Sequence, residues 1–387
     1  MPEYLAPGVY VEEVSFRSKE IEGVSTSTAG FVGATAVGPT EGPRAVTSLT
    51  DFEQNYGDGC RLTFADVAAP LHNYMWHAAR AFFAQGGKRL FVQRVVGGKG
   101  KRPDATEYAG VCGLQAFERV AEIAAVAAPG STFGYQGEYG PQARSIARAL
   151  VEHAERMRYR VAVLDPGDRQ EVEQVLAMRN LIDSTYAVLY YPWLRTGEVV
   201  VPPSGFVSGI YARNDLSRGV EKAPANEPVR GTVELETIVS EADAEALNAR
   251  GINGFRVFDR GEIRLWGART TSSDPEWKYV NVRRYFAYLE HSIDRGTQWT
   301  VFEPNAEPLW AAVRTAIANF LVGEWRRGAL AGEKPEEAFY VKCDRSTMTQ
   351  SDLDEGRLVC LAGLAPLRPA EFVNIRIGRW TADHSCP

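Results

Sequence analysis

Short apolar runs recur through the first half of the chain, and longer amphipathic stretches separate them. The runs with the composition of buried strands are residues 29–34, 89–96, 123–127, 159–164 and 186–191. Stretches 71–85, 142–158 and 169–181 have the length and periodicity of helices. Strands that alternate with helices are typical of βαβ units, so the pattern predicts an α/β domain with a mostly parallel sheet and flanking helices.

The second half of the chain has a different pattern. Aromatic-rich and amphipathic stretches predict helices over residues 280–294 and 309–327. Because the βαβ pattern does not continue here, we expect a central domain over residues 23–270 and a smaller α+β C-terminal domain over residues 271–370.

The two ends of the chain differ from both domains. Val9–Val14 is strand-forming but too short to fold alone, and it is either an edge strand of the first sheet or an arm that pairs with another subunit. Residues 371–378 alternate apolar and polar positions, as a half-buried strand does. We therefore expect extended arms over residues 1–22 and 371–387.

Charge and cysteine content narrow the class of protein. A net charge of -6 and a pI near 5.6 argue against a nucleic-acid coat, because phosphate binding needs a concentrated basic surface. The short basic loop Gly97–Arg102 is interpreted as a solvated connection. The cysteines, at positions 60, 112, 343, 360 and 386, form no Cys-x-x-Cys pair, which suits a reducing cytoplasm and thiols acting as small apolar groups. Without a leader or a long apolar run, we expect cytoplasmic synthesis and no membrane insertion.

Residues that could carry catalysis form no recognisable site. Ser204 lacks the flanking glycines of a nucleophile elbow, and His72 and His77 are five positions apart, which is not the spacing of a helical zinc pair. Asp165 follows a strand and suits either a catalytic carboxylate or a capping turn. We expect no catalytic, cofactor or metal site. The alternatives are a nucleotide- or sugar-binding α/β enzyme and a static capsid-like or tube protein.

Residues 201–293 contain several long and unusual phrases. They are PPSGFVSGIYARND, KAPANEPV, WGART and NVRRYF, and PGVYVEEV and PAEFVNIRI stand near the two ends. Together they resemble the contractile phage tail sheath proteins and the sheaths of related contractile injection systems, over almost the whole chain. Proline and glycine in these phrases set backbone direction, and Gly205 and Gly209 permit close approach of another segment.

The resemblance implies a structural function and no enzymatic one. Copies would stack as helical rings around an inner tube, meet baseplate and terminator proteins, and contract to drive the tube through a target envelope. Such a subunit is assembled in the bacterial cytoplasm and ends in a phage tail or tail-like particle, without nucleic acid or cofactor. The central domain of the family is often described as subtilisin-like, but here no serine or histidine is placed as in a protease triad.

The resemblance also implies where the subunit meets its neighbours. Strands exchanged between subunits would come from the arms, at Val9, Tyr10, Val11, Phe372, Val373, Asn374, Ile375, Arg376 and Ile377. In the helix over 309–327, the apolar residues Leu309, Val313, Ile317 and Phe320 share one face. Across the helix lie Thr315, Asn319 and Arg326, which form either a solvated surface or, by the resemblance, the face turned to the inner tube.

Overall fold

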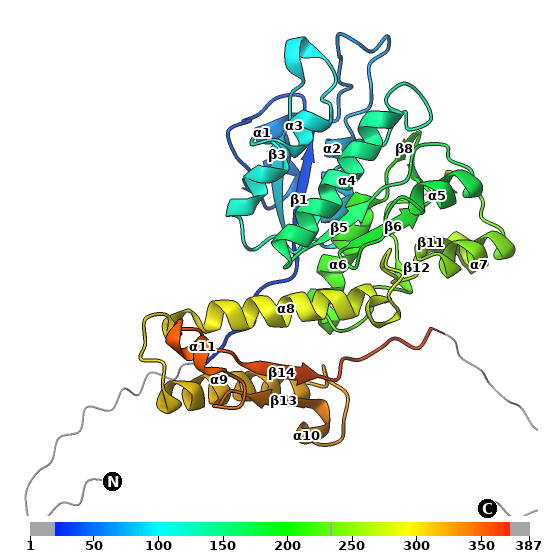
Figure 1. Cartoon of the computed structure of the whole chain (residues 1–387). Helices are drawn as coiled ribbons and strands as arrows, with labels where there is room; N and C mark the ends of the chain where they lie inside the picture. The colour runs from blue at the N-terminus through cyan, green and yellow to red at the C-terminus, as the bar shows by residue number, and fades with distance from the viewer. Residues whose placement is uncertain (1–19, 233, 372–387) are drawn as a thin grey trace, which may run out of the picture.

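The computed structural model describes residues 20–232 and 234–371. A central α/β domain lies above a smaller α+β layer, and the long helix α8 (Val280–Gly296) runs between them (Figure 1). This arrangement confirms the predicted fold class.

The central sheet has nine strands, and its middle is parallel as predicted. Strands β3, β1, β4, β5, β6 and β11 run parallel, whereas β2, β12 and β9 join its two edges in antiparallel fashion. In spatial order the strands are β2 (Arg44–Val46), β3 (Arg89–Arg94), β1 (Thr28–Gly33), β4 (Ala125–Ala127), β5 (Val161–Leu164), β6 (Ala187–Tyr191), β11 (Ile252–Val257), β12 (Ile263–Trp266) and β9 (Glu227–Pro228).

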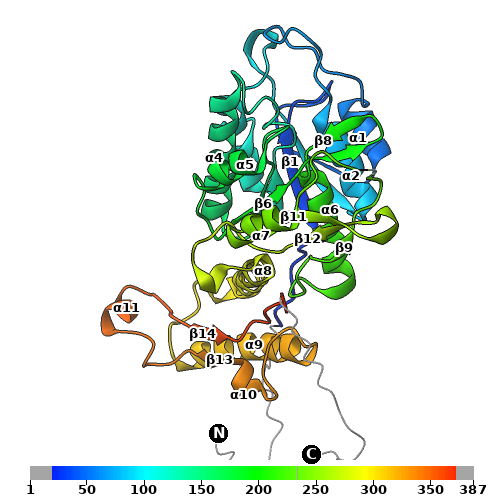
Figure 2. The ribbon, with the colours of Figure 1, turned by 90° about the vertical axis from the view of Figure 1, so that its right-hand side faces the viewer.

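Helices cover both faces of this sheet, and each face has its own apolar core (Figure 2). One face is covered by α1 (Leu49–Tyr56), α2 (Tyr74–Gln85) and α6 (Ser204–Arg218). The other is covered by α3 (Ala105–Ala109), α4 (Gly140–Met157), α5 (Val172–Arg179) and α7 (Glu241–Ala249). A small sheet of β10 (Glu234–Leu235), β7 (Leu194–Thr196) and β8 (Val199–Val201) lies beside them. Burial on both faces explains why the central strands are uniformly apolar.

The C-terminal layer is built on α9 (Glu307–Arg326), against which a two-stranded hairpin packs. The hairpin strands are β13 (Phe339–Lys342) and β14 (Leu361–Leu364), preceded by α10 (Pro335–Ala338) and joined through α11 (Gln350–Asp354). Short 3-10 turns occur at Gly98–Gly100, Leu114–Arg119, Asp259–Gly261, Pro275–Trp277 and Gln298–Thr300.

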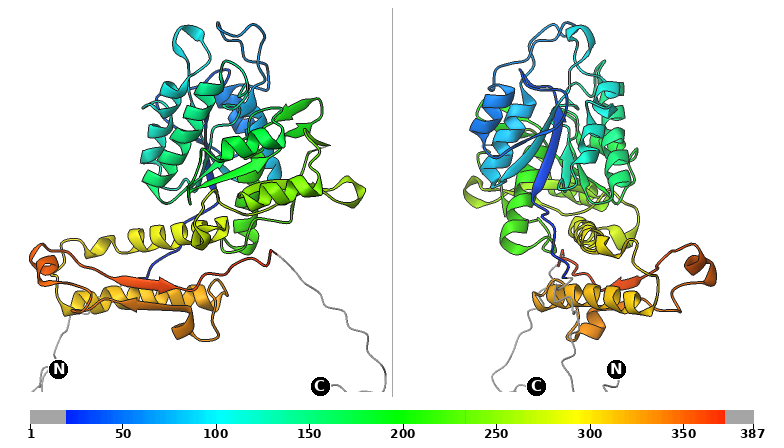
Figure 3. Two further views of the ribbon diagram at one scale, coloured as in Figure 1. Left: turned by 45° about the vertical axis from the view of Figure 1, so that its right-hand side comes forward. Right: turned by 90° about the vertical axis from the view of Figure 1, so that its left-hand side faces the viewer.

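Two extended segments lie at the two limits of the described chain (Figure 3). Residues 20–27, here called the N-terminal connector, descend from β1 to the C-terminal layer. Residues 365–371, the C-terminal connector, follow β14 and rise toward the start of α8. The strands predicted at Val9–Val14 and after Glu371 lie outside the described residues.

Several element boundaries differ from the predicted ones for local reasons. Helix α2 begins at Tyr74, not at residue 71, because the Asn73 side chain caps it by accepting a hydrogen bond from the Trp76 backbone N–H at 3.2 Å. Helix α4 begins at Gly140, since Pro141 fits the first turn of a helix.

Helix α6 is the largest element that the sequence pattern did not predict. Its sequence SGFVSGIYARNDLSR has glycine, serine and asparagine, which all favour turns over helix interiors. It forms because α2 packs against it closely. A Cβ on Gly205 would lie 2.6 Å from the Cα of Ala78, and one on Gly209 would lie 2.6 Å from the Phe82 carbonyl oxygen. The predicted close approach at these glycines is therefore a contact between two helices.

We expect Gly205→Ala to lower the free energy of unfolding by about 1–3 kcal/mol, because the added methyl group forces α2 and α6 apart. Urea unfolding followed by circular dichroism measures the change. The matched control is Gly323→Ala in α9, where no atom lies within 4 Å of an added Cβ. That variant should gain up to about 1 kcal/mol. Equal stability of the two variants would contradict the close packing of α2 on α6.

Candidate interaction site at the roots of the two chain ends

The N-terminal connector lies along α8. Ile21 packs against the last residue of this helix, at whose position a Cβ would come within 2.8 Å of Ile21. Farther along, the Val24 backbone N–H donates to Ser292 Oγ at 3.1 Å. Near the start of the helix, Arg284 Nη2 donates to the Thr26 carbonyl oxygen at 3.2 Å. The connector thus runs antiparallel to α8 and is held at three points.

A buried ion pair fixes the upper end of this connector. Arg284 binds both carboxylate oxygens of Asp215, at 2.5 and 3.0 Å, and each side chain is only 3% exposed. Thr26 Oγ1 donates to the same carboxylate at 2.6 Å, and the Arg284 guanidinium lies over the Tyr211 ring at 4.5 Å. Burial disfavours the Arg284 charge, but the Asp215 carboxylate outweighs burial and raises the pKa of Arg284. One ion pair therefore joins α6, α8 and the connector.

The C-terminal connector ends in a second cluster, centred on Glu371. Its two oxygens accept from Arg269 Nε and Nη2, each at 2.7 Å, in a bidentate pair. Tyr279 O–H, Lys278 Nζ and Asn248 Nδ2 donate to the same carboxylate at 3.0, 3.3 and 3.3 Å. Burial raises the pKa of Glu371, but these donors, Arg269 above all, lower it to about 2. The last described residue is thus held firmly beside the start of α8.

Asn281, in the first turn of α8, ties further segments to this region. Its Nδ2 donates to the Glu221 carbonyl oxygen at 2.8 Å and to the Leu367 carbonyl oxygen, in the C-terminal connector, at 3.3 Å. Val220, next to Glu221, belongs to the apolar core of the C-terminal layer. The loop after α6 therefore bridges the central domain and that layer.

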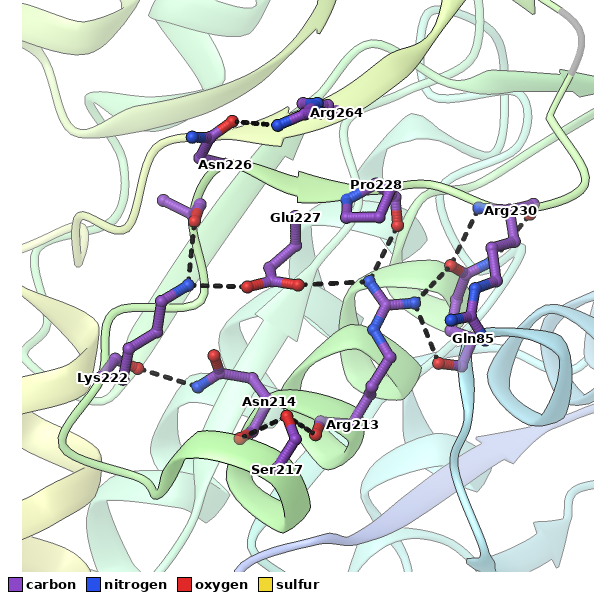
Figure 4. A network of polar contacts seen from close by, with 11 residues as sticks. Gln85, Arg213, Asn214, Ser217, Lys222, Asn226, Glu227, Pro228, Arg230 and Arg264 are labelled. Carbon is purple, nitrogen blue, oxygen red and sulfur yellow. Dashed lines mark hydrogen bonds and ion pairs between the residues drawn. The ribbon is translucent and has the colours of Figure 1, made fainter.

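A polar network holds this loop against α6 (Figure 4). Glu227 accepts from Lys222 Nζ at 2.7 Å and pairs with Arg213 at 3.5 Å. Arg213 also donates to the carbonyl oxygens of Gln85 and Pro228, at 3.0 and 2.8 Å. The KAPANEPV phrase is thereby fastened to α6, to the end of α2 and to the sheet edge.

Four of the unusual phrases, with the start of a fifth at Glu371, therefore contribute to these polar contacts. Asp215 and Arg213 come from ARND, Lys222 and Glu227 from KAPANEPV, Arg269 from WGART, and Asn281 and Arg284 from NVRRYF. The sequence analysis did not identify these charged residues as functional, and it placed Glu371 in the C-terminal arm without predicting its pairing with Arg269. Their signal in the sequence was the presence of arginine and carboxylate residues within unusual phrases.

Some of the predicted interface residues belong to the described part of the chain and others do not. Val9, Tyr10, Val11 and residues 372–377 lie outside the described residues. Thr315, Asn319 and Arg326 are all exposed on one side of α9, whereas Val313 and Ile317 are buried against the C-terminal core. The helix is amphipathic as predicted, and a polar face is left free within the described part of the chain.

The hairpin of β13 and β14 leaves its outer face open. Tyr340 is 61% exposed and Leu361 is 49% exposed, while the inner face packs on α9. The Tyr340 ring occupies the space above Gly363, where a Cβ would clash at 2.1 Å. A two-stranded sheet is marginally stable by itself, so this hairpin depends on its packing against α9.

Asp165 and Ser204, the residues considered as catalytic candidates, stabilise the start of α6. Asp165 accepts hydrogen bonds from the Ser204 backbone N–H and hydroxyl, both at 2.7 Å, and so caps α6. Burial raises the pKa of Asp165 to about 7, and the Ser204 hydrogen bonds oppose that shift. Ser204 is fully buried and cannot meet a substrate.

Among the residues described, no cluster of histidine, cysteine and carboxylate side chains could hold a metal ion. Across that same part of the chain, no helix is long and apolar enough to span a bilayer.

Replacement of Glu371 by glutamine should destabilise the fold in a pH-dependent manner. The folded-state pKa of Glu371, about 2, lies below its ordinary value of 4.5. Its stabilising contribution is therefore complete above about pH 4.5 and is lost as the pH falls toward 2. The difference in unfolding free energy between wild type and Glu371→Gln, measured by urea unfolding at a series of pH values, should shrink over that interval.

The control for this experiment is Glu122→Gln. Glu122 pairs with Arg89 at 3.0 Å, but both side chains are more than 40% exposed. Its loss should cost less than about 1 kcal/mol at any pH. An effect of Glu371→Gln no larger than that of the control would show that the Glu371 cluster does not hold the connector.

Comparison with known proteins identifies two matching family models. The family model for the phage tail sheath protein central domain matches residues 98–271, and the model for the phage tail sheath C-terminal domain matches residues 272–378. A putative prophage major tail sheath protein of Pseudomonas aeruginosa is 24% identical over 96% of this chain and 95% of its own length. The tail sheath protein of Enterobacteria phage T4 is 25% identical over half of this chain and 30% of its own length.

Solved structures of contractile sheaths are similar to this chain over almost its whole length. The helical sheath of the anti-feeding prophage in its contracted state is 28% identical, covers 97% of this chain and 99% of its own, and has a TM-score of 0.77. The contracted sheath complex of the extracellular contractile injection system PVC is 27% identical, covers 98% of both chains and has a TM-score of 0.75. The enzyme alternative finds no support in these matches. The chain belongs to the phage tail sheath protein family and is a structural subunit of a contractile sheath.

Proposed function

We propose that this subunit polymerises as stacked helical rings around an inner tube and contracts to drive that tube through a target cell envelope. The observation that supports this function most is that the outer ends of the two connectors, at Ile21 and Glu371, lie at opposite ends of α8. A helix of 17 residues separates their roots by about 25 Å. Two links leaving from opposite ends of one rigid element suit a head-to-tail assembly, in which each copy is tied to different neighbours.

The arms provide the links. Val9, Tyr10 and Val11 at one end, and Phe372, Val373, Asn374, Ile375, Arg376 and Ile377 at the other, add as strands to sheets of neighbouring copies. Their receptor is the hairpin of β13 and β14, to which no further strand pairs among residues 20–232 and 234–371 and whose outer face is exposed there. Each backbone hydrogen bond gained contributes about 0.5–1.5 kcal/mol, so a paired arm survives while the bodies rotate.

The proposed division of labour follows the domains. Residues 23–270 form the rigid outer body, residues 271–370 form the layer that contacts the tube, and residues 1–22 and 371–387 form the arms. The exposed residues Thr315, Asn319 and Arg326 of α9 turn toward the inner tube. A polar contact there permits release, because little apolar area is buried. Baseplate and terminator proteins meet the two ends of the sheath.

The subunit acts without catalysis, cofactor or nucleic acid. Support comes from the family and from the buried, capping role of Asp165 and Ser204. Assembly takes place in the bacterial cytoplasm, and the product is a phage tail or tail-like particle. Contraction draws on energy stored in the lattice at assembly.

Removal of the residues before Glu20 or of those after Glu371 should abolish polymerisation without unfolding the subunit. A chain that starts at Glu20 keeps the contacts of Ile21, Val24 and Thr26, and a chain that ends at Glu371 keeps its pairing with Arg269. Both truncated chains should therefore unfold at the wild-type temperature, yet form no sheaths on tubes and baseplates in electron micrographs.

A milder change tests the same arm. Ile375→Pro removes one backbone donor and should block assembly, whereas Ile375→Val keeps the donor and should assemble normally. Contractile sheaths of normal length from either truncated chain would overturn the arm assignment.

Arg326→Glu should weaken assembly around the tube, because it reverses a charge on the exposed face of α9. The free subunit should keep its stability within about 0.5 kcal/mol, as exposed substitutions usually do. The yield of sheathed tubes in negative-stain images measures the effect. Arg148→Glu, at an exposed position of α4, is the matched control and should assemble normally. Equal yields from the two variants would show that α9 does not face the tube.

A further inference from the structure

Two cysteines face each other across the hairpin of the C-terminal layer. Lys342, the last residue of β13, pairs with Leu361, the first residue of β14, in an antiparallel register. The next pair in that register is Cys343 opposite Cys360. Directly opposed residues of antiparallel strands lie about 4.5–5.5 Å apart at their Cα atoms. That separation falls inside the range of about 4.4–6.8 Å over which disulfides form.

The two side chains also point to the same side of the hairpin. Both belong to the apolar core that packs on α9, together with the alternating residues Phe339 and Val341. Cys343 is fully buried and Cys360 is half-buried. Burial raises the pKa of both thiols, that of Cys360 to about 12, and the two sulfur groups share a hydrogen bond. The thiols are therefore in contact, and one of them can be reached from solvent.

We propose that Cys343 and Cys360 form a redox modification site that closes to a disulfide across the hairpin by exchange with small-molecule disulfides such as oxidised glutathione. In the first step the Cys360 thiolate attacks one sulfur of the small disulfide, which breaks the S–S bond and releases one thiol. In the second step the Cys343 thiolate attacks the Cys360 sulfur, and the second small thiol leaves. The protein loses two protons and two electrons, and the small disulfide is reduced to two thiols.

The order of the steps follows from exposure, since Cys360 alone of the pair has a surface open to solvent. Only the thiolate reacts, and the raised pKa of Cys360 keeps the thiolate fraction small at neutral pH. The reaction should be slow at neutral pH and should accelerate nearly tenfold for each pH unit.

Closure would matter because of where the pair lies. The disulfide encloses the segment that carries α11 and fastens the two strands at the end where the loop leaves them. A cytoplasmic pool keeps thiols reduced, whereas the extracellular environment favours disulfides. This locking role rests on the proposed function. The hairpin would accept arms while the two thiols are reduced, and the disulfide would fix its two strands after the particle leaves the cell. The exchange reaction itself does not depend on that function.

The test uses the purified full-length chain. It is incubated with oxidised glutathione at pH 8, denatured, alkylated and digested without reduction for peptide mapping. We expect a peptide pair linked through Cys343 and Cys360, and slower hydrogen exchange in β13 and β14 after closure. Cys343→Ala should stop the reaction at the first step and leave glutathione on Cys360. Cys360→Ala should leave Cys343 as a free thiol.

The exposed Cys112 provides the control, because Cys112→Ala should leave the linkage unchanged. Glutathione confined to Cys60 and Cys112, with Cys343 and Cys360 both recovered as alkylated thiols, would overturn the proposal. The map of the wild-type chain decides this outcome even if a variant folds poorly. The disulfide could form and yet leave assembly unchanged when the subunit is oxidised before assembly. That result would refute only the locking role.

Discussion

The buried ion pair between Arg284 and Asp215 is the contact on which the arrangement of the lower half of the molecule depends. It joins α8 to α6, and through Thr26 it also holds the N-terminal connector. An arginine and a carboxylate that are both almost fully buried stabilise each other only as a pair, since loss of either leaves an unpaired buried charge at a cost of about 3–5 kcal/mol. Three segments are thus committed to one geometry.

Helix α8 sets the distance between the two connectors. Its start carries the Glu371 cluster and its end packs against Ile21, so the roots of both arms are set by one rigid element. A sheath subunit must remain attached to several neighbours while its orientation changes. The contacts that hold both connectors to α8 support the proposal that the body moves as a unit.

The hairpin of β13 and β14 has the opposite character. It consists of two short strands that depend on α9 for stability, and in the described part of the chain its outer face is exposed and no further strand pairs with its edges. Its inner face carries the paired thiols of Cys343 and Cys360. Within the described residues the hairpin has only two strands, which supports the proposal that strands from other copies add to it, next to the α9 face proposed to meet the tube.

The sequence by itself determined the fold class, the positions of five parallel strands along the chain, the amphipathic helices and the sheath resemblance. These features arise from local periodicity and from long phrases of unusual composition, which are visible without contacts. Helix α6 was missed because packing on α2 overrides its poor helix propensity. Only the tertiary structure decided that Asp215 meets Arg284, 69 positions away, and that Arg269 meets Glu371, 102 positions away. Such pairs depend on how distant segments are brought together, and no local pattern of charge carries that information.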